Sequence, residues 1–213
     1  MKKRINPAIL VETFGEFERE VDALLQITNE FDLDLINWKR ADKKTLPAVE
    51  AIELNRFVRM NCDIMMDDPR STVDLLIKSK FPKRIIVNLE SDFPILPLIK
   101  NIKAANIEAG VSINPEGKAT DLVKFFPYCD FIQIMTIAPG VQGNPFLESR
   151  LGLSFEIREL GYDGLIGIDG GVNFKTIPLV KKYPIDVISV GSSFSQSVDP
   201  SSIYKAMEDL LND

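Results

Sequence analysis

Residues 5–10 read INPAIL, and the residues after this apolar stretch decide between two folds. The stretch is short enough for a buried strand, and a helical pattern follows it. In an open, doubly wound sheet the first strand normally runs into a glycine-rich phosphate loop. Here Pro7 and Ala8 occupy the stretch, and no glycine occurs before Gly15. The missing loop favours a closed barrel over an open sheet.

Seven more apolar runs of strand length follow, and helical patterns separate them. Strict alternation of strands and helices predicts a parallel sheet. Eight such units in 213 residues match a compact (βα)8 barrel. We therefore expect residues 1–213 to form a single TIM barrel of the α/β class. The expected later strands cover 33–38, 57–65, 84–90, 107–113, 130–137, 164–169 and 186–191.

The clearest helical pattern covers 14–31, where apolar residues recur on one face, and the weakest covers 47–56. Asp68-Pro69 and Asp199-Pro200 each place an acidic cap before a proline, which predicts two helix starts. The remaining helices are expected at 69–80, 94–105, 117–126, 147–161, 173–183 and 200–212.

Composition restricts the class of protein. The chain is 45% hydrophobic and 26% charged, as in a globular protein, and its net charge of −6 argues against a nucleic-acid partner. No apolar run approaches the roughly 20 residues needed to cross a bilayer, so no membrane association is expected. Cys62 and Cys129 lie far apart without metal spacing, which is typical of free thiols in a reducing cytoplasm. We expect a cytoplasmic location.

Candidate site residues lie at the carboxyl ends of the expected strands, where a barrel builds its active site. The second strand ends in INWKRAD, residues 36–42, a charge cluster in a chain that contains no histidine. Strand alternation predicts that Trp38 points away from Asn37 and Lys39 and packs under a helix. The candidates at these ends are Asn37, Lys39, Asp42, Asp63, Met65, Asn88, Met135 and Asp169.

Glycines at the last two strand ends predict a phosphate site. Gly170 and Gly171 follow the seventh strand, and Gly191 and Ser192 follow the eighth. Glycine allows backbone N–H groups to approach a ligand closely, and barrels often bind phosphate after strands seven and eight. Either pair alone is also typical of a simple turn.

The stretch APGVQGNPF, residues 138–146, predicts a lid over the ligand and contains Gly140 and Gly143. The alternative is a plain connector with a single turn.

These motifs together resemble ribulose-phosphate 3-epimerase, in order and over nearly the whole chain. The matching stretches are INPAIL (5–10), DIMMDDP (63–69), IKAANIEAGVSINP (102–115), IMTIAPGVQGNPF (134–146), GIDGGVN (167–173) and VGSSF (190–194). The resemblance implies a ribulose-phosphate-binding TIM barrel that epimerises carbon 3 of a ketose phosphate through an enediolate. It implies two catalytic aspartates, a divalent metal (Zn, Fe, Mn or Mg) and a homo-oligomer. It also implies a phosphate site in the 138–146 loop and at the four residues after the last two strands.

The active-site positions of the family match only in part. Its first metal histidine falls at Asn37 and its metal-binding aspartate at Lys39, while the following Met-Asp-Gly falls at 41–43, which includes Asp42. Its second metal histidine falls at Asp63, a further histidine at Asn88 and an early serine at Ala8. Asp169 keeps the second catalytic aspartate, and Met65 and Met135 keep the pocket methionines.

Because most metal ligands are replaced, we expect no cofactor and no metal site of the family type, with Asp63 and Asp169 as weak candidates. The favoured function is a metal-independent epimerase or isomerase of a pentulose or hexulose phosphate. In it Lys39 supplies the positive charge, Asp169 is the base, and Asp63 or Lys39 is the acid.

Two alternatives remain open. The first is a catalytically degenerate protein that binds a phosphosugar without turnover. The second is a lyase or decarboxylase of the related phosphate-binding barrels, which would use Lys39 and Asp42. In the plainest interpretation Lys39 and Asp42 form only a strand-end ion pair.

Overall fold

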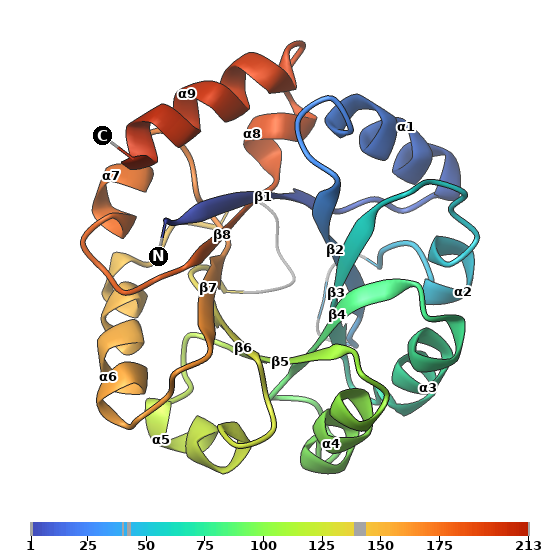
Figure 1. Cartoon of the computed structure of the whole chain (residues 1–213), viewed down its shortest axis with the longest axis vertical. Coiled ribbons are helices and arrows are strands. Elements are labelled where there is room, and N and C mark those ends of the chain that lie inside the picture. The colour runs from blue at the N-terminus through green and yellow to red at the C-terminus, as the bar shows by residue number, and fades with distance from the viewer. Residues whose placement is uncertain (1, 40, 42–43, 139–143, 213) are drawn as a thin grey trace.

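The eight strands form one closed parallel barrel, seen in the computed structural model of the chain (Figure 1). The structure describes residues 2–39, 41, 44–138 and 144–212. Each strand pairs in parallel with the next, and β1 pairs with β8 to close the ring. The strands are β1 (Arg4–Ile9), β2 (Glu30–Asn37), β3 (Arg59–Met66), β4 (Pro82–Asn88), β5 (Glu108–Ile113), β6 (Phe131–Met135), β7 (Leu165–Asp169) and β8 (Val187–Val190). The predicted barrel is therefore confirmed.

Helices surround the barrel as an outer ring (Figure 1). They are α1 (Phe14–Leu24), α2 (Ala48–Ala51), α3 (Arg70–Ser79), α4 (Leu96–Ala104), α5 (Ala119–Leu122), α6 (Leu153–Glu159), α7 (Ile177–Val180), α8 (Ser192–Ser195) and α9 (Pro200–Asn212), with 3-10 turns η1 (Val123–Phe125) and η2 (Glu148–Gly152). Within the described residues no helix is long and apolar enough to span a membrane.

Helix α1 shows how local sequence sets the element boundaries. Thr13 caps its first turn through a capping box with Glu16, and Phe17, Val21 and Leu24 bury its inner face. The helix ends at Leu24, so the predicted helix over 14–31 is too long. Phe31 belongs to β2, where it lies on the strand face that packs under the helices. Its burial there explains why it continued the apolar pattern of the helix.

Two faces of each strand have different roles. Alternate residues such as Leu33, Leu35, Cys62 and Ile64 are buried in the main core between barrel and helices. The residues between them point into the barrel interior, where a TIM barrel stacks side chains in layers. In this chain many of those interior residues are polar.

Candidate functional site

The lower part of the barrel interior holds ion pairs. Arg84 is fully buried, donates to Glu108 at 2.5 Å and lies 4.1 Å from the ring centre of Phe131. Lys83 pairs with Glu30 at 2.8 Å. This layer closes the amino-terminal end of the barrel, far from where barrels bind ligands.

The middle layer is centred on Asp32. Its carboxylate accepts hydrogen bonds from Asn6 at 3.0 Å and Asn61 at 2.8 Å, and a further one from Ser189. These partners come from β1, β3 and β8, so Asp32 ties its own strand β2 to three others around the interior. A buried carboxylate with three donors is satisfied, which indicates a structural role.

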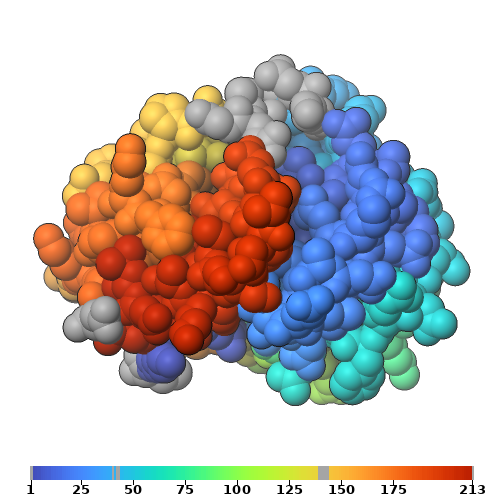
Figure 2. Space-filling view, turned by 90° about the horizontal axis from the view of Figure 1, so that it is seen from above, coloured from blue at the N-terminus to red at the C-terminus, as the bar shows by residue number. Residues whose placement is uncertain are grey.

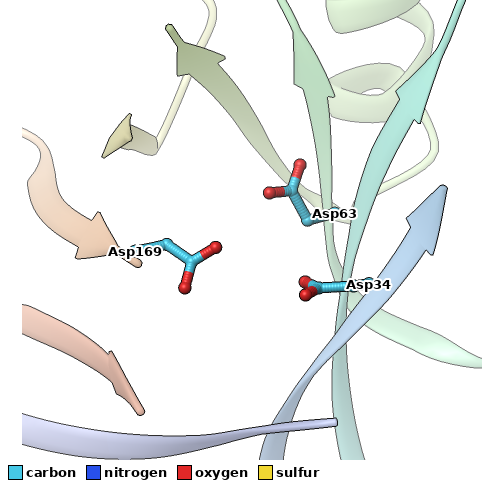
Figure 3. Close-up of side chains that lie close together, drawn as sticks. All are labelled: Asp34, Asp63 and Asp169. Atoms are coloured by element: carbon cyan, nitrogen blue, oxygen red, sulfur yellow. The ribbon is translucent and has the colours of Figure 1, made fainter. Parts of the chain in front are cut away.

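Three more aspartates meet one layer higher, at the carboxyl ends of their strands. Asp34 lies on β2, Asp63 on β3 and Asp169 on β7, and one carboxylate oxygen of each lies within 4.8 Å of the others. Figure 3 shows Asp169 facing Asp34 and Asp63 across the interior. We call these three residues the aspartate trio. Asp34 and Asp63 lie on neighbouring strands, and Asp169 lies on the opposite side of the barrel, so only closure of the barrel brings the three together.

Hydrogen bonds hold Asp63 in place. Gln133 of β6 donates to Oδ2 of Asp63 at 2.6 Å, and Ser112 of β5 donates to Oδ1 at 3.3 Å. Behind them, Asn88 donates to Ser112 at 3.2 Å and to Asn114 at 3.0 Å. The orientation of the Asp63 carboxylate is therefore fixed by side chains from three other strands.

Asp34 is held through its backbone instead. The recorded pairing of β1 with β2 ends at Ile9 and Leu33, and Thr45 takes over the edge of β2 beyond that point. The Thr45 hydroxyl donates to the carbonyl of Asp34 at 2.6 Å and accepts from the N–H of Ile36 at 2.8 Å. The Asp34 carboxylate has no hydrogen bond or ion pair with any described residue, although it is only 7% exposed.

Burial and mutual repulsion perturb the protonation of the trio. Desolvation, followed by the charges of Asp169 and Asp63, raises the pKa of Asp34 well above its usual value. Desolvation and Asp169 raise the pKa of Asp63, while its bonds to Ser112 and Gln133 act in the opposite direction. Desolvation and Asp32 raise the pKa of Asp169 to about 7. Buried acids of this kind are typical of functional sites.

The trio fits a divalent cation. Three carboxylates converge, and no lysine or arginine in the described part of the chain pairs with any of them. A set of oxygens alone suits hard cations such as Mg²⁺, Mn²⁺ or Ca²⁺, whereas zinc sites usually include nitrogen or sulfur ligands. The residues that would hold the cation are Asp34, Asp63 and Asp169.

The residue beside Asp63 on the neighbouring strand β2 is Asp34, and not Asn37 as predicted. Asp34 pairs in register with Asp63, whereas Asn37 pairs with Met66 at the strand end and is exposed. The expectation that Asn37 takes the place of the first metal ligand is therefore wrong. Alternation explains the error: Asn37 lies an odd number of residues from Asp34, so it faces the other side of the strand.

Lys39 is also outside the trio. It is exposed, and its backbone N–H donates to Asp67 at 3.0 Å. Trp38, expected under a helix, is instead buried with Ile36 and Met65 on the inner face, beyond the trio at the barrel mouth. The predicted side is therefore wrong for Trp38, and the Lys39 side chain is exposed.

Other predicted residues fall at the mouth or outside the described residues. Met65, Asn88 and Met135 are buried on inner strand faces. Asp42, Gly140 and Gly143, and with them most of the predicted lid, lie outside the described residues. Gly170 and Gly171 both have positive φ, 107° and 70°, directly after β7, and Gly191 and Ser192 follow the neighbouring β8.

Sequence reasoning missed Asp34, Gln133 and Ser112. A signal for each was present, because a polar residue interrupts a buried strand at an inward position. In β2 the alternation of Asp32 and Asp34 with Leu33 and Leu35 has a period of two, which indicates a polar interior face.

Comparison with known proteins identifies the family. Residues 4–195 match the model of the Ribulose-phosphate 3 epimerase family. The chain belongs to the ribulose-phosphate 3-epimerase family. A ribulose-phosphate 3-epimerase of Mycobacterium leprae is 24% identical over 209 residues, which cover 95% of this chain and 92% of that relative.

A second relative and a solved structure extend this result. The ribulose-phosphate 3-epimerase of Eremothecium gossypii is 28% identical over 153 residues, covering 72% of this chain and 64% of its own length, a little under two thirds. The structure of 3-hexulose-6-phosphate synthase from Salmonella typhimurium superposes with a TM-score of 0.73 at 14% identity, covering 99% of this chain and 98% of that one. At that identity the likeness concerns the fold alone.

Proposed function

We propose that this member of the ribulose-phosphate 3-epimerase family is an isomerase that epimerises a ketose phosphate at carbon 3. The observation that carries the proposal is the placement of carboxyl groups on opposite walls of the barrel mouth (Figure 3). Epimerisation requires one group to remove a proton from one face of a carbon and another to return a proton to the opposite face. Asp169 stands on one wall, and Asp34 and Asp63 stand on the other.

In the proposed reaction Asp169 removes the carbon-3 proton, and the electron pair moves to the carbon-2 carbonyl oxygen to give an enediolate. Asp34 or Asp63, protonated, then delivers a proton to the other face of carbon 3. In the absence of a cation the raised pKa values suit these roles, because the pKa of Asp169 is raised to about 7 and those of Asp34 and Asp63 lie above their usual value. The reverse reaction exchanges the roles of the two walls.

A divalent cation held by the trio would supply Lewis-acid stabilisation for the enediolate oxygen. The expected metal independence required the Lys39 ammonium in that place, and the exposed side chain of Lys39 does not provide it.

The substrate phosphate is proposed to bind at the glycines after β7 and β8. Gly170 and Gly171 adopt left-handed backbone conformations, and Gly191 and Ser192 lie at the end of the adjacent strand. The phosphate would then bind at the same end of the barrel as the trio, directly beside Asp169, the last residue of β7. Met65 and Met135 would provide an apolar wall for the carbon chain.

Exchange of the carbon-3 proton with solvent tests the proposal directly. The protein is incubated in D₂O with D-ribulose 5-phosphate, and separately with a hexulose phosphate, with and without added Mn²⁺ or Mg²⁺. We expect deuterium at carbon 3 by NMR with at least one of these sugars, and no exchange with Asp169→Asn. Exchange that survives in that variant would mean that the assigned base is wrong.

Absence of exchange with all of these sugars, together with measurable sugar-phosphate binding, would favour the non-catalytic binding protein. The lyase alternative depends on Lys39, whose side chain is exposed, and on Asp42, which lies outside the described residues. Release of formaldehyde or CO₂ from a sugar phosphate would establish it.

A further inference from the structure

A cavity of about 200 Å³ lies between helix α1 and the segment that runs from α8 into α9. These helices are neighbours in the outer ring (Figure 1). Apolar side chains line the cavity from both sides, with Ala23 and Leu24 on α1 and Phe194 and Pro200 opposite. An apolar protein cavity of roughly 150 Å³ can hold a benzene molecule, so this one has room for a slightly larger ligand.

Glu20 of α1 places a carboxyl group in this cavity. The side chain is partly buried, and no described residue forms a hydrogen bond or an ion pair with it. Desolvation, followed by the negative charge of Glu16, raises the pKa of Glu20 to about 7. Both effects disfavour the ionised form, so a ligand that carries a positive charge would be stabilised beside this carboxylate.

The other two charged residues of the lining already have partners. The Glu16 carboxylate accepts hydrogen bonds from two backbone N–H groups at the start of α1, at 3.1 and 3.2 Å. Its hydrogen bond with Thr13 is the main cause that lowers its pKa, and the charge of Arg19 adds to that effect. The Arg19 guanidinium reaches back towards Gly15, where its Nη1 would lie 3.6 Å from an added Cβ. Among the described lining residues, Glu20 is therefore the anion that lacks a counterion.

Two hydroxyl groups complete the polar part of the lining. Ser195 and Ser197 lie on the side opposite α1, and the Ser197 hydroxyl accepts the N–H of Asp199 at 3.0 Å. A hydroxyl oxygen has two lone pairs, so each serine can accept a hydrogen bond from a ligand. A primary ammonium group has three N–H donors, which matches one carboxylate and two hydroxyls.

From this lining we propose that the cavity binds a small organic cation, a primary ammonium group on a short apolar body, with Glu20 as its counterion. The ammonium group pairs with the Glu20 carboxylate, and the apolar body packs against Leu24, Phe194 and Pro200. The cavity contains no residue of the aspartate trio or of the proposed phosphate site. The proposal therefore stands or falls independently of the proposed reaction.

The experiment compares benzylamine with benzyl alcohol, an uncharged compound of nearly the same shape. The full chain is titrated with each compound at pH 8, where a group with the pKa of Glu20 is ionised. Calorimetry gives the affinity, and amide shifts in ¹H–¹⁵N NMR spectra locate the site. We expect one saturable benzylamine site per chain, at least roughly fivefold tighter than that for benzyl alcohol. The shifts should be centred on Ala23, Ser195 and Ser197.

Three variants separate charge from shape. Glu20→Gln removes the charge and should lower the benzylamine affinity to that of benzyl alcohol, whose own binding should not change. Glu53→Gln, exposed and outside the cavity, is the matched control and should bind benzylamine as the parent does. Ala23→Leu adds bulk to the lining without changing any charge and should weaken the binding of both compounds.

Two results would overturn the proposal. The first is folded parent protein that does not bind benzylamine, or a Glu20→Gln variant that binds it as tightly as the parent. The second is a set of amide shifts confined to the barrel mouth, which would assign the amine to the aspartate trio. If Glu20→Gln folds poorly, the comparison with benzyl alcohol and the Ala23→Leu variant decide the same question.

Discussion

At the scale of single residues, Gly170 is fixed by both its backbone and its neighbour. Its φ of 107° is rarely adopted by residues with a side chain, and a Cβ there would lie 2.4 Å from Cγ1 of Ile137. The glycine is therefore required by packing beside the trio, whatever ligand binds there.

Replacing this glycine tests that requirement. Gly170→Ala should lower the free energy of unfolding by about 1–3 kcal/mol, because both strain and overlap are introduced. Gly152→Ala is the control, since Gly152 has a helical φ of −59° and open space around it. The measurement is urea denaturation of both variants, and equal stabilities would contradict the role given to Gly170.

Glu20 on α1 carries a perturbed carboxyl group away from the trio. It lines a cavity between α1 and the start of α9, and desolvation followed by the charge of Glu16 raises its pKa to about 7. The folded protein therefore keeps the proton over a pH range in which the unfolded chain, with a value near 4.5, has lost it.

This shift gives a signed pH prediction. The Glu20 contribution to stability falls as pH rises from about 4.5 to about 7, because the folded state binds the extra proton. Glu20→Gln should therefore match the parent at pH 4.5 and exceed it at pH 8, as measured by thermal unfolding at each pH. Glu53→Gln, at an exposed site, should show no such pH-dependent gain, and a gain for Glu20→Gln that is independent of pH would refute the assignment.

At the scale of elements, the end of β2 depends on a residue that is not in the sheet. Thr45 bonds the backbone of Asp34 and Ile36 through its hydroxyl and bonds Ile36 again through its own N–H at 3.1 Å. The next residue, Leu46, donates to Val11 at 2.8 Å. The connection after β2 thereby closes the gap between β1 and β2 beneath the barrel mouth.

Removing the Thr45 hydroxyl should loosen this closure. Thr45→Val keeps the shape but leaves a buried N–H and a buried carbonyl unpaired, so we expect a loss of about 1–3 kcal/mol in unfolding free energy. Thr45→Ser retains the hydroxyl and should recover most of the loss. Chemical denaturation compares the three proteins, and a Thr45→Val variant as stable as the parent would show that the two bonds are not needed.

The positions of the strands and helices were largely predictable from the sequence. Which residues at the end of β2 point into the barrel was not. Alternating apolar runs place all eight strands, because burial on the core side leaves a strong signal in sequence. Near its end β2 becomes apolar on both faces, with Leu35 outside and Ile36 and Trp38 inside, so periodicity there does not assign a side. The partners of Asp63 come from β5 and β6, and contacts between distant strands leave no local pattern.

At the scale of the whole molecule, the two ends of the chain meet. Figure 2 shows the blue early segments against the orange and red late ones on one face. Helix α9 packs against α1, α7, α8 and β1, and it lies beyond residues 4–195 that match the family. Met207 and Leu211 bury its inner face.

Shortening the side chain of Met207 tests how much the packing of helix α9 contributes to the stability of the fold. Met207 is fully buried, so Met207→Ala should lower the unfolding free energy by about 2–5 kcal/mol. Lys205→Ala, exposed on the same helix, should change it by less than about 0.5 kcal/mol. Guanidinium denaturation measures both, and similar values for the two variants would show that α9 is only loosely attached.

The pairing of β1 with β8 also has a consequence for synthesis of the protein. Residues 4–7 of β1 pair with residues 187–190 of β8. During synthesis β1 therefore cannot pair with β8 until almost the whole chain has left the ribosome. Until then the interior stays open, and its aspartates remain hydrated and ionised. The electrostatic cost of enclosing them falls on the final step, when contacts between distant residues form.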